Sequence, residues 1–242
     1  MSSRNGRTAV IAQPTYLPWL GYFELIARAD VVIFLDTVQF EKQSWQCRNR
    51  LKGSDGKPFW LTVPLMNHSL ATPLREIRIS PHQESWRKKH LRSIEVHLGA
   101  GPYFQQLFPS LQQWLNTEYD YLADLNIDGI KMFSELLALS PRFVRASALN
   151  PKGHKTELVV GLCRQVGADH YYSSAGSKAY LDERLFAEAG IRLTYQTWEH
   201  PLYAQRGKDF VSHLAVVDAL MNIGPQSTRA LIATVGTAMV NG

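Results

Sequence analysis

Residues 8–35 read TAVIAQPTYLPWLGYFELIARADVVIFL, and this stretch decides the fold class. Residues 8–12 predict a short buried strand. Residues 31–35 predict a second, because a continuous apolar and β-branched run is typical of a strand covered on both faces. Between them two prolines hold an open loop, since proline has no N–H to donate, and residues 20–27 have helical spacing. Strand, loop, helix and strand form a βαβ unit, which favours a parallel sheet.

The C-terminal part of the chain repeats this alternation. Strands are predicted at residues 142–146, 170–173 and 191–195, helices at 155–166 and 182–190, and two further helices at 212–222 and 226–235. Asp182 is expected to cap the helix that it begins, since its carboxylate can accept from free N–H groups there. We therefore expect an α/β fold with a mostly parallel, doubly wound sheet.

A helical block interrupts the two α/β portions. Helical patterns occupy about residues 83–98, 103–116 and 120–139, with Ser80 and Gln83 forming a capping box before the first. Ahead of the block, residues 59–65 and 74–79 predict strands that are close enough to pair antiparallel. We expect one domain over residues 1–242, with a helical sub-domain at about 81–140.

Composition narrows the class of protein. The 242 residues are 45% hydrophobic and 19% charged, which is a globular composition. Cys47 and Cys163 form no CxxC pair, so a reduced compartment is expected, and no apolar run reaches membrane-spanning length. These features predict a cytoplasmic protein. The net charge of +5 suits a small phosphate- or carboxylate-bearing substrate, while nucleic acid is suggested by charge alone. An oligomer is left open.

Several islands carry a resemblance to a known family. Residues 13–23 (QPTYLPWLGYF), 34–50 (FLDTVQFEKQSWQCRNR) and 60–64 (WLTVP) resemble the opening signature of the WbqC-like family. Residues 167–181 (GADHYYSSAGSKAYL) and 212–222 (SHLAVVDALMN) resemble its later motifs. The resemblance implies a role beside bacterial O-antigen and other surface-polysaccharide genes.

Two positions depart from the family pattern. Ala12 stands where members commonly have His, which excludes a His base or ligand at that position. Cys47 stands where they often have Asn, so a Cys nucleophile there would not be a family trait.

Three residues are candidates for catalysis. Asp36 follows a buried strand, where a carboxylate can be a general base, a metal ligand or an acceptor for a sugar hydroxyl; the alternative is a carboxylate that braces the loop. Ser174 and Lys178 belong to a hydroxyl-rich loop after another strand. In that loop the N–H groups around Gly176 and Ser177, with Lys178, could hold an oxyanion; the alternative is an ordinary connecting loop.

The candidate substrate-binding residues can donate to or accept from phosphates, hydroxyls and amides. They are Gln13, Tyr16, Tyr22, Gln39, Lys42, Ser44, Arg48, Asn49, Arg50, Gly176 and Ser177. The alternative for the amides is loop bracing, and for each cation it is a solvated surface. Because ligands bind beyond the carboxyl ends of parallel strands, we expect the polar segments to meet in one cleft.

The function remains a choice between classes. A transferase that uses a sugar nucleotide or an activated acyl donor ranks first, and a non-catalytic binding or assembly protein of the same pathway ranks second. The loop also resembles that of HIGH-type nucleotidyltransferases, but Tyr16 and Tyr22 stand in a loop where those enzymes need histidines. No metal site and no cofactor is predicted beyond a nucleotide or acyl-coenzyme donor. His200 and His213 are candidates for acid–base work, and Asp218 for a structural role.

Overall fold

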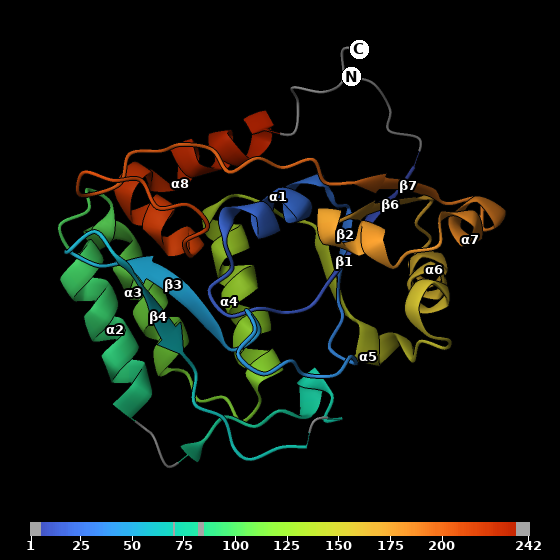
Figure 1. Cartoon of the computed structure of the whole chain (residues 1–242), viewed down its shortest axis with the longest axis horizontal. Helices are drawn as coiled ribbons and strands as arrows, with labels where there is room; N and C mark the ends of the chain where they lie inside the picture. Colours follow the sequence, from blue (N-terminus) through green and yellow to red (C-terminus); the bar gives the residue numbers. More distant parts are fainter. Residues whose placement is uncertain (1–5, 70, 82–84, 236–242) are drawn as a thin grey trace.

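The structure, a computed structural model, describes residues 6–69, 71–81 and 85–235 (Figure 1). Its centre is a five-stranded sheet in the order β5-β2-β1-β6-β7, and every neighbouring pair is parallel. The strands are β1 (Thr8–Ala12), β2 (Val31–Phe34), β5 (Arg142–Arg145), β6 (His170–Ser173) and β7 (Arg192–Tyr195). This order confirms the expected α/β fold with a parallel sheet.

Helices cover both faces of the sheet, because alternate strand residues point to opposite faces. Val10 and Val32 pack into a large core with α1 (Leu20–Arg28) and α8 (Val216–Val235). Ala9 and Val31 pack into a second core. That core is formed with α5 (Ala146–Leu149), α6 (Lys155–Gln165) and α7 (Glu183–Glu188). The sheet is therefore doubly wound, as the pattern predicted.

The helical block is present where it was expected. Its helices are α2 (Ser85–Leu98), α3 (Phe104–Asn116) and α4 (Leu122–Leu136), which lie in Figure 1 on the side of the molecule away from α6 and α7. Their apolar faces belong to the same core as α1 and α8. The division into domain and sub-domain stays a prediction. The capping box falls partly on Gln83, which lies outside the described residues.

An antiparallel ribbon of β3 (Arg48–Lys52) and β4 (Pro58–Thr62) lies apart from the main sheet. The predicted strand at 59–65 thus exists, but the prediction that it pairs with residues 74–79 was wrong, because it pairs with β3. Residues 74–76 form the short 3-10 turn η1 (Leu74–Glu76), and only the isolated bridge Leu65↔Ile79 links the two expected strands. The basic sequence of β3 concealed a strand whose alternate residues, Asn49 and Leu51, are buried.

The helix α8 is interrupted at Gly224. The two predicted helices form one element that breaks at Gly224, whose φ is 79°, and Pro225 follows directly. A Cβ added at Gly224 would lie 2.5 Å from the Tyr103 ring, so both the backbone conformation and the contact require glycine. Asp182 caps α7 as predicted, since its side chain accepts from the N–H of Arg184.

Candidate functional site

Two arginines and two tryptophans form an open surface on the ribbon, called here the arginine–tryptophan face (Trp45, Arg48, Arg50 and Trp60). The Arg48 guanidinium lies 4.2 Å from the centre of the Trp60 ring, and that of Arg50 lies 5.7 Å from the same ring. Trp45 is 40% exposed and Trp60 44%. Among the described residues, no ion pair neutralises either arginine. The face therefore offers two unneutralised cations beside exposed rings.

A second group of rings adjoins this face and is called the histidine cluster (Trp19, Trp198, His200 and His213). The His213 ring stacks on Trp19 with centroids 5.0 Å apart, and it lies 5.0 Å from the His200 ring. Trp198 meets Trp19 edge-on at 4.7 Å.

Arg50 joins the two groups. Its Nη2 donates to the backbone carbonyls of Ser212 and His213, at 3.4 and 3.5 Å. The backbone N–H of Ala215 donates in turn to the carbonyl of Arg50 at 3.0 Å. The ribbon and the segment that leads into α8 are thus held side by side, and both surfaces belong to one region.

Both histidines of the cluster are neutral bases at pH 7. Burial lowers the pKa of His200 to about 4. Partial burial and the nearby Arg50 guanidinium lower the pKa of His213 as well. His200 Nδ1 lies 2.9 Å from the carbonyl of Pro201, so Nδ1 carries the proton and the lone pair is on Nε2. His213 is exposed, and its φ of 58° is unusual for a residue other than glycine.

The loop before α1 is braced by several of the predicted binding residues. Asn49 Nδ2 donates to the carbonyls of Tyr16 and Leu17, and Gln46 donates to Gln13 Oε1 at 2.6 Å. The Tyr22 hydroxyl donates to the Gln13 carbonyl at 3.0 Å.

Tyr16 itself is fully buried, with its hydroxyl 2.8 Å from His90 Nδ1, and burial raises the pKa of this hydroxyl far above its usual value. For Gln13, Tyr16, Tyr22 and Asn49 these contacts favour a positioning role over direct binding.

Asp36 is also engaged inside the protein. Its carboxylate is fully buried and accepts from the backbone N–H of Ser147 at 2.9 Å and from the Ser147 hydroxyl at 2.6 Å. Ser147 is the second residue of α5, directly after β5, so these bonds tie the carboxyl ends of β2 and β5 together. The contacts favour the bracing alternative for Asp36.

The loop after β6 divides into buried and exposed residues. Ser177 is buried and lies 2.6 Å from the Ser173 hydroxyl, while Ser174, Gly176 and Lys178 are exposed. Lys178 Nζ lies 5.9 Å from the Tyr195 ring. A Cβ added at Gly176 would meet nothing within 4 Å, so glycine is not required there by a close approach. The oxyanion role of this loop stays a prediction.

The structure separates some of the residues that were expected to share a cleft. Asp36 faces Ser147 beside β5, whereas Lys178 lies over β7, and these two strands are the opposite edges of the sheet. Gln39 and Lys42 are exposed, and Ser44 donates to the carbonyl of Glu41. Arg48 and Arg50 lie together on the ribbon. In the loop before α1, Tyr22 contacts Gln13 and Asn49 contacts Tyr16.

The sequence patterns did not indicate that the rings of the histidine cluster lie together. His200 and His213 were expected only as separate candidates for acid–base work, and Trp198 was not singled out. His213 and Trp19 lie in two different motif islands, but nothing in their spacing indicates that their rings stack. The Trp-x-His pattern after a predicted strand is the signal that could have pointed to Trp198.

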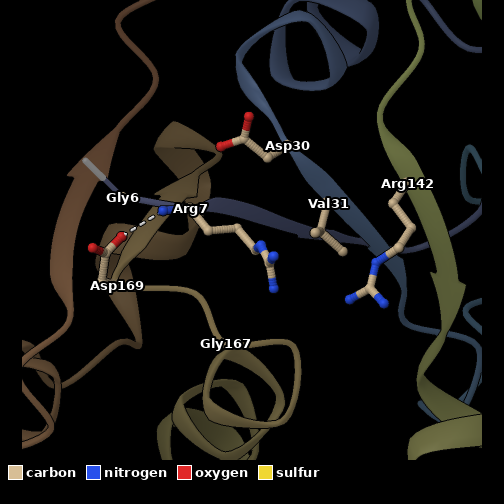
Figure 2. A pocket seen from close by; sticks show the side chains of 7 residues that line it. All are labelled: Gly6, Arg7, Asp30, Val31, Arg142, Gly167 and Asp169. Carbon is tan, nitrogen blue, oxygen red and sulfur yellow. Dashed lines mark hydrogen bonds between the residues drawn. The ribbon is translucent and has the colours of Figure 1, made fainter. Parts of the chain in front are cut away.

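A large, open pocket of about 690 Å³ lies at the opposite, amino-terminal edge of the sheet. Figure 2 shows Arg7 and Arg142 on either side of it. Asp169 accepts from the backbone N–H of Arg7, and Asp30 from that of Thr8. The two carboxylates of this pocket are thus occupied by backbone N–H groups. Parallel sheets also bind ligands at the carboxyl ends of their strands, so this pocket is not the candidate site.

The described residues contain neither a cluster of metal-binding side chains nor a membrane-spanning helix. Within residues 6–69, 71–81 and 85–235, no group of three or more His, Cys, Asp or Glu side chains is placed to hold a metal ion. Among the helices described, none is long and apolar enough to cross a membrane.

Comparison with known proteins identifies the family of this chain. The profile of the WbqC-like protein family matches residues 13–230. The chain is also 31% identical over 224 residues to the Uncharacterized protein Rv1507c of Mycobacterium tuberculosis (strain ATCC 25618 / H37Rv), a match that covers 91% of this chain and 96% of that protein. No solved structure matches the chain. On the length of the family match, the chain belongs to the WbqC-like protein family.

Proposed function

We propose that the protein is a transferase whose donor is built on a nucleoside diphosphate and that it serves the assembly of a surface polysaccharide or a related glycan. The donor would be a sugar nucleotide or an acyl-coenzyme, both of which carry a nucleoside and a diphosphate. The observation that carries the proposal is the arginine–tryptophan face, where two arginines without an ion pair among the described residues lie beside exposed rings. The pathway rests on the family resemblance.

The proposed binding mode follows from ordinary recognition chemistry. Guanidinium groups bind phosphate oxygens through paired N–H donors, and their charge is not titrated near neutral pH. Tryptophan rings stack on the flat faces of bases and sugars, with about 1–3 kcal/mol for each stacked base. Arg48 and Arg50 would hold the diphosphate, while Trp45 or Trp60 would cover the base or sugar.

The proposed base is His213. It is exposed, it is neutral at pH 7, and its backbone is tied to Arg50. A neutral imidazole at this place can take the proton of an acceptor hydroxyl as the hydroxyl attacks the group to be transferred. The bond from that group to the nucleoside diphosphate, or to the sulfur of the coenzyme, breaks, and the nucleoside diphosphate or the coenzyme leaves. Ser174 and Lys178 stay catalytic candidates in the loop that could hold an oxyanion, because both are exposed on the loop after β6.

The test combines binding with turnover. A panel of nucleotide sugars and acyl-coenzymes is titrated calorimetrically, and any bound donor is then assayed for release of its nucleotide by mass spectrometry. We expect Arg48→Gln to weaken binding at least tenfold, the effect of one lost charge-assisted pair at about 1.5–3 kcal/mol. We expect His213→Gln to retain binding and lose turnover. Failure of the whole panel to bind would remove the proposal.

A non-catalytic binding protein is the second candidate. The observation that favours it is Asp36, whose carboxylate is buried and bound to Ser147 rather than open to a substrate. In that case a donor binds with the same dependence on Arg48, but no product forms, and His213→Gln changes nothing. Product formation that depends on His213 decides for the enzyme.

A further inference from the structure

A second pocket lies between β3, the end of α2 and the beginning of α8. Its volume is about 100 Å³, which is room for about three water molecules. Pockets for whole ligands are several times larger, at roughly 300–1,000 Å³. The lining residues are Lys52, Gly53, Ser54, His97, Leu98, Arg206, Gly207, Asp218 and Asn222. A pocket of this size takes one small group.

Two cations line this pocket. Lys52 is only 4% exposed, and its Nζ donates to the carbonyl of Asp209, which uses one of its three N–H donors. The backbone at Gly207 lies close to this amine, since a Cβ added at Gly207 would lie 3.6 Å from Nζ. Arg206 is exposed, and within the described residues its guanidinium has no ion pair.

The one carboxylate in the lining carries a weakened charge. Asp218 is 1% exposed, and its Oδ1 accepts from the Tyr203 hydroxyl at 2.8 Å. Burial raises the pKa of Asp218 to about 6, although Tyr203 and Lys52 act in the opposite direction. A minor part of the Asp218 population is therefore protonated at neutral pH, and the lining has two cations against this one carboxylate.

His97 supplies a further donor. Its Nδ1 accepts from the backbone N–H of Ser54 at 3.1 Å, so the proton of the neutral ring is on Nε2. The Asn222 side chain donates to the backbone carbonyl of Asp218 and keeps its own oxygen available. The lining thus combines cationic and neutral donors with acceptors that suit a protonated oxygen.

We propose that this pocket binds a phosphate-sized anion, held by Lys52 and Arg206, either as the free ion or as the end group of a phosphomonoester. The site is separate from the arginine–tryptophan face and does not depend on the function proposed for it. The shape argues for a small group, and the surplus of cations argues for an anion. A protonated Asp218 can donate to an anion oxygen, which allows the carboxyl group to remain beside a bound phosphate.

The test uses the full chain and two probes, inorganic phosphate and glycerol 3-phosphate, titrated calorimetrically at constant ionic strength. Arg206→Gln is the main variant, because Arg206 is exposed and the fold does not depend on it. We expect this variant to bind both probes about fivefold or more weakly than the unaltered chain does. Arg192→Gln removes an exposed arginine of β7 and serves as the control. This control should bind phosphate as the unaltered chain does.

Asp218→Asn gives an independent readout of the sign of the occupant's charge. Asparagine can still accept from Tyr203, so the local bonds are kept while the negative charge is lost. Phosphate affinity should rise by about threefold or more if the occupant is an anion. Stronger binding of glycerol 3-phosphate than of phosphate identifies the end group of a monoester, and the reverse identifies the free ion.

Three results would overturn the assignment. They are the absence of saturable binding of either probe, an Arg206→Gln variant that binds like the unaltered chain, and weaker anion binding after Asp218→Asn. None of these results touches the proposed donor site, since Arg48 is tested there with other ligands.

Discussion

Asp36→Ala tests whether the buried carboxylate after β2 holds the sheet edge together. The substitution removes two hydrogen bonds to a charged acceptor, from the backbone N–H and the hydroxyl of Ser147. Each such bond contributes about 1.5–3 kcal/mol, and part of this is offset because the carboxylate no longer has to be desolvated. The expected loss in the free energy of unfolding is therefore about 3 kcal/mol. For a chain of this size that is a fall in Tm of about 6–12 °C.

Urea unfolding followed by circular dichroism measures this loss. Ser147→Ala removes only the hydroxyl bond and should cost about half as much. The double variant should cost less than the sum of the two single ones, because the partners share one interaction. Thr37→Ala, beside Asp36 in the chain, serves as the matched control. An Asp36→Ala chain as stable as the unaltered one, but without turnover, would refute the bracing role and restore the catalytic one.

Further predictions concern the histidines, the glycines and the exposed face. His200→Gln should become more stable relative to the unaltered chain as pH falls from about 6.5 to 4. The pKa of His200 in the folded state is about 4, below its value in the unfolded state, so protonation at acid pH favours the unfolded state of the unaltered chain. Equal acid unfolding of the two chains would contradict this. Gly224→Ala should cost more than about 1 kcal/mol in thermal unfolding because of its positive φ and the Tyr103 ring. Gly176→Ala, in open space, should cost less than about 0.5 kcal/mol, and equal losses for the two glycines would be unexpected. Trp60→Leu should leave Tm nearly unchanged but weaken donor binding in calorimetry; unchanged affinity would remove its stacking role.

The main sheet could be predicted because local patterns define it. The runs at residues 8–12 and 31–35 are apolar throughout, since both faces of these strands are covered by helices. Asp182 was recognised for a similar reason, because its cap is made with Arg184, only two residues away. Signals of this kind lie within a short window of sequence.

The ribbon could not be predicted from the same signals. Residues 48–52 look like a basic surface, but they pair with β4, and the buried Asn49 side chain donates to the carbonyls of Tyr16 and Leu17. Those partners lie more than thirty residues away along the chain, at separations of 33 and 32. Residues 74–79 alternate like a strand, but their backbone bonds go to other segments, as in Leu74 to Val38.

In the candidate site, too, local sequence predicted some residues, while others depend on contacts between distant segments. Arg48 and Arg50 were identified as binding candidates because they lie in a short basic segment of the sequence. The stacking of His213 on Trp19 depends on how the segment after β7 crosses the beginning of α1, which is a tertiary contact. For Asp36, the position at a strand end was correct, but the partner that occupies its carboxylate, Ser147, is 111 residues away.

The most direct measurement is a crystal structure of the chain soaked with a nucleoside diphosphate. We predict diphosphate density within hydrogen-bond reach of the guanidinium groups of Arg48 and Arg50, with the base or sugar against the ring of Trp45 or Trp60. Density for the same molecule between Arg7 and Arg142 at the amino-terminal edge of the sheet, with the ribbon left bare, would contradict it.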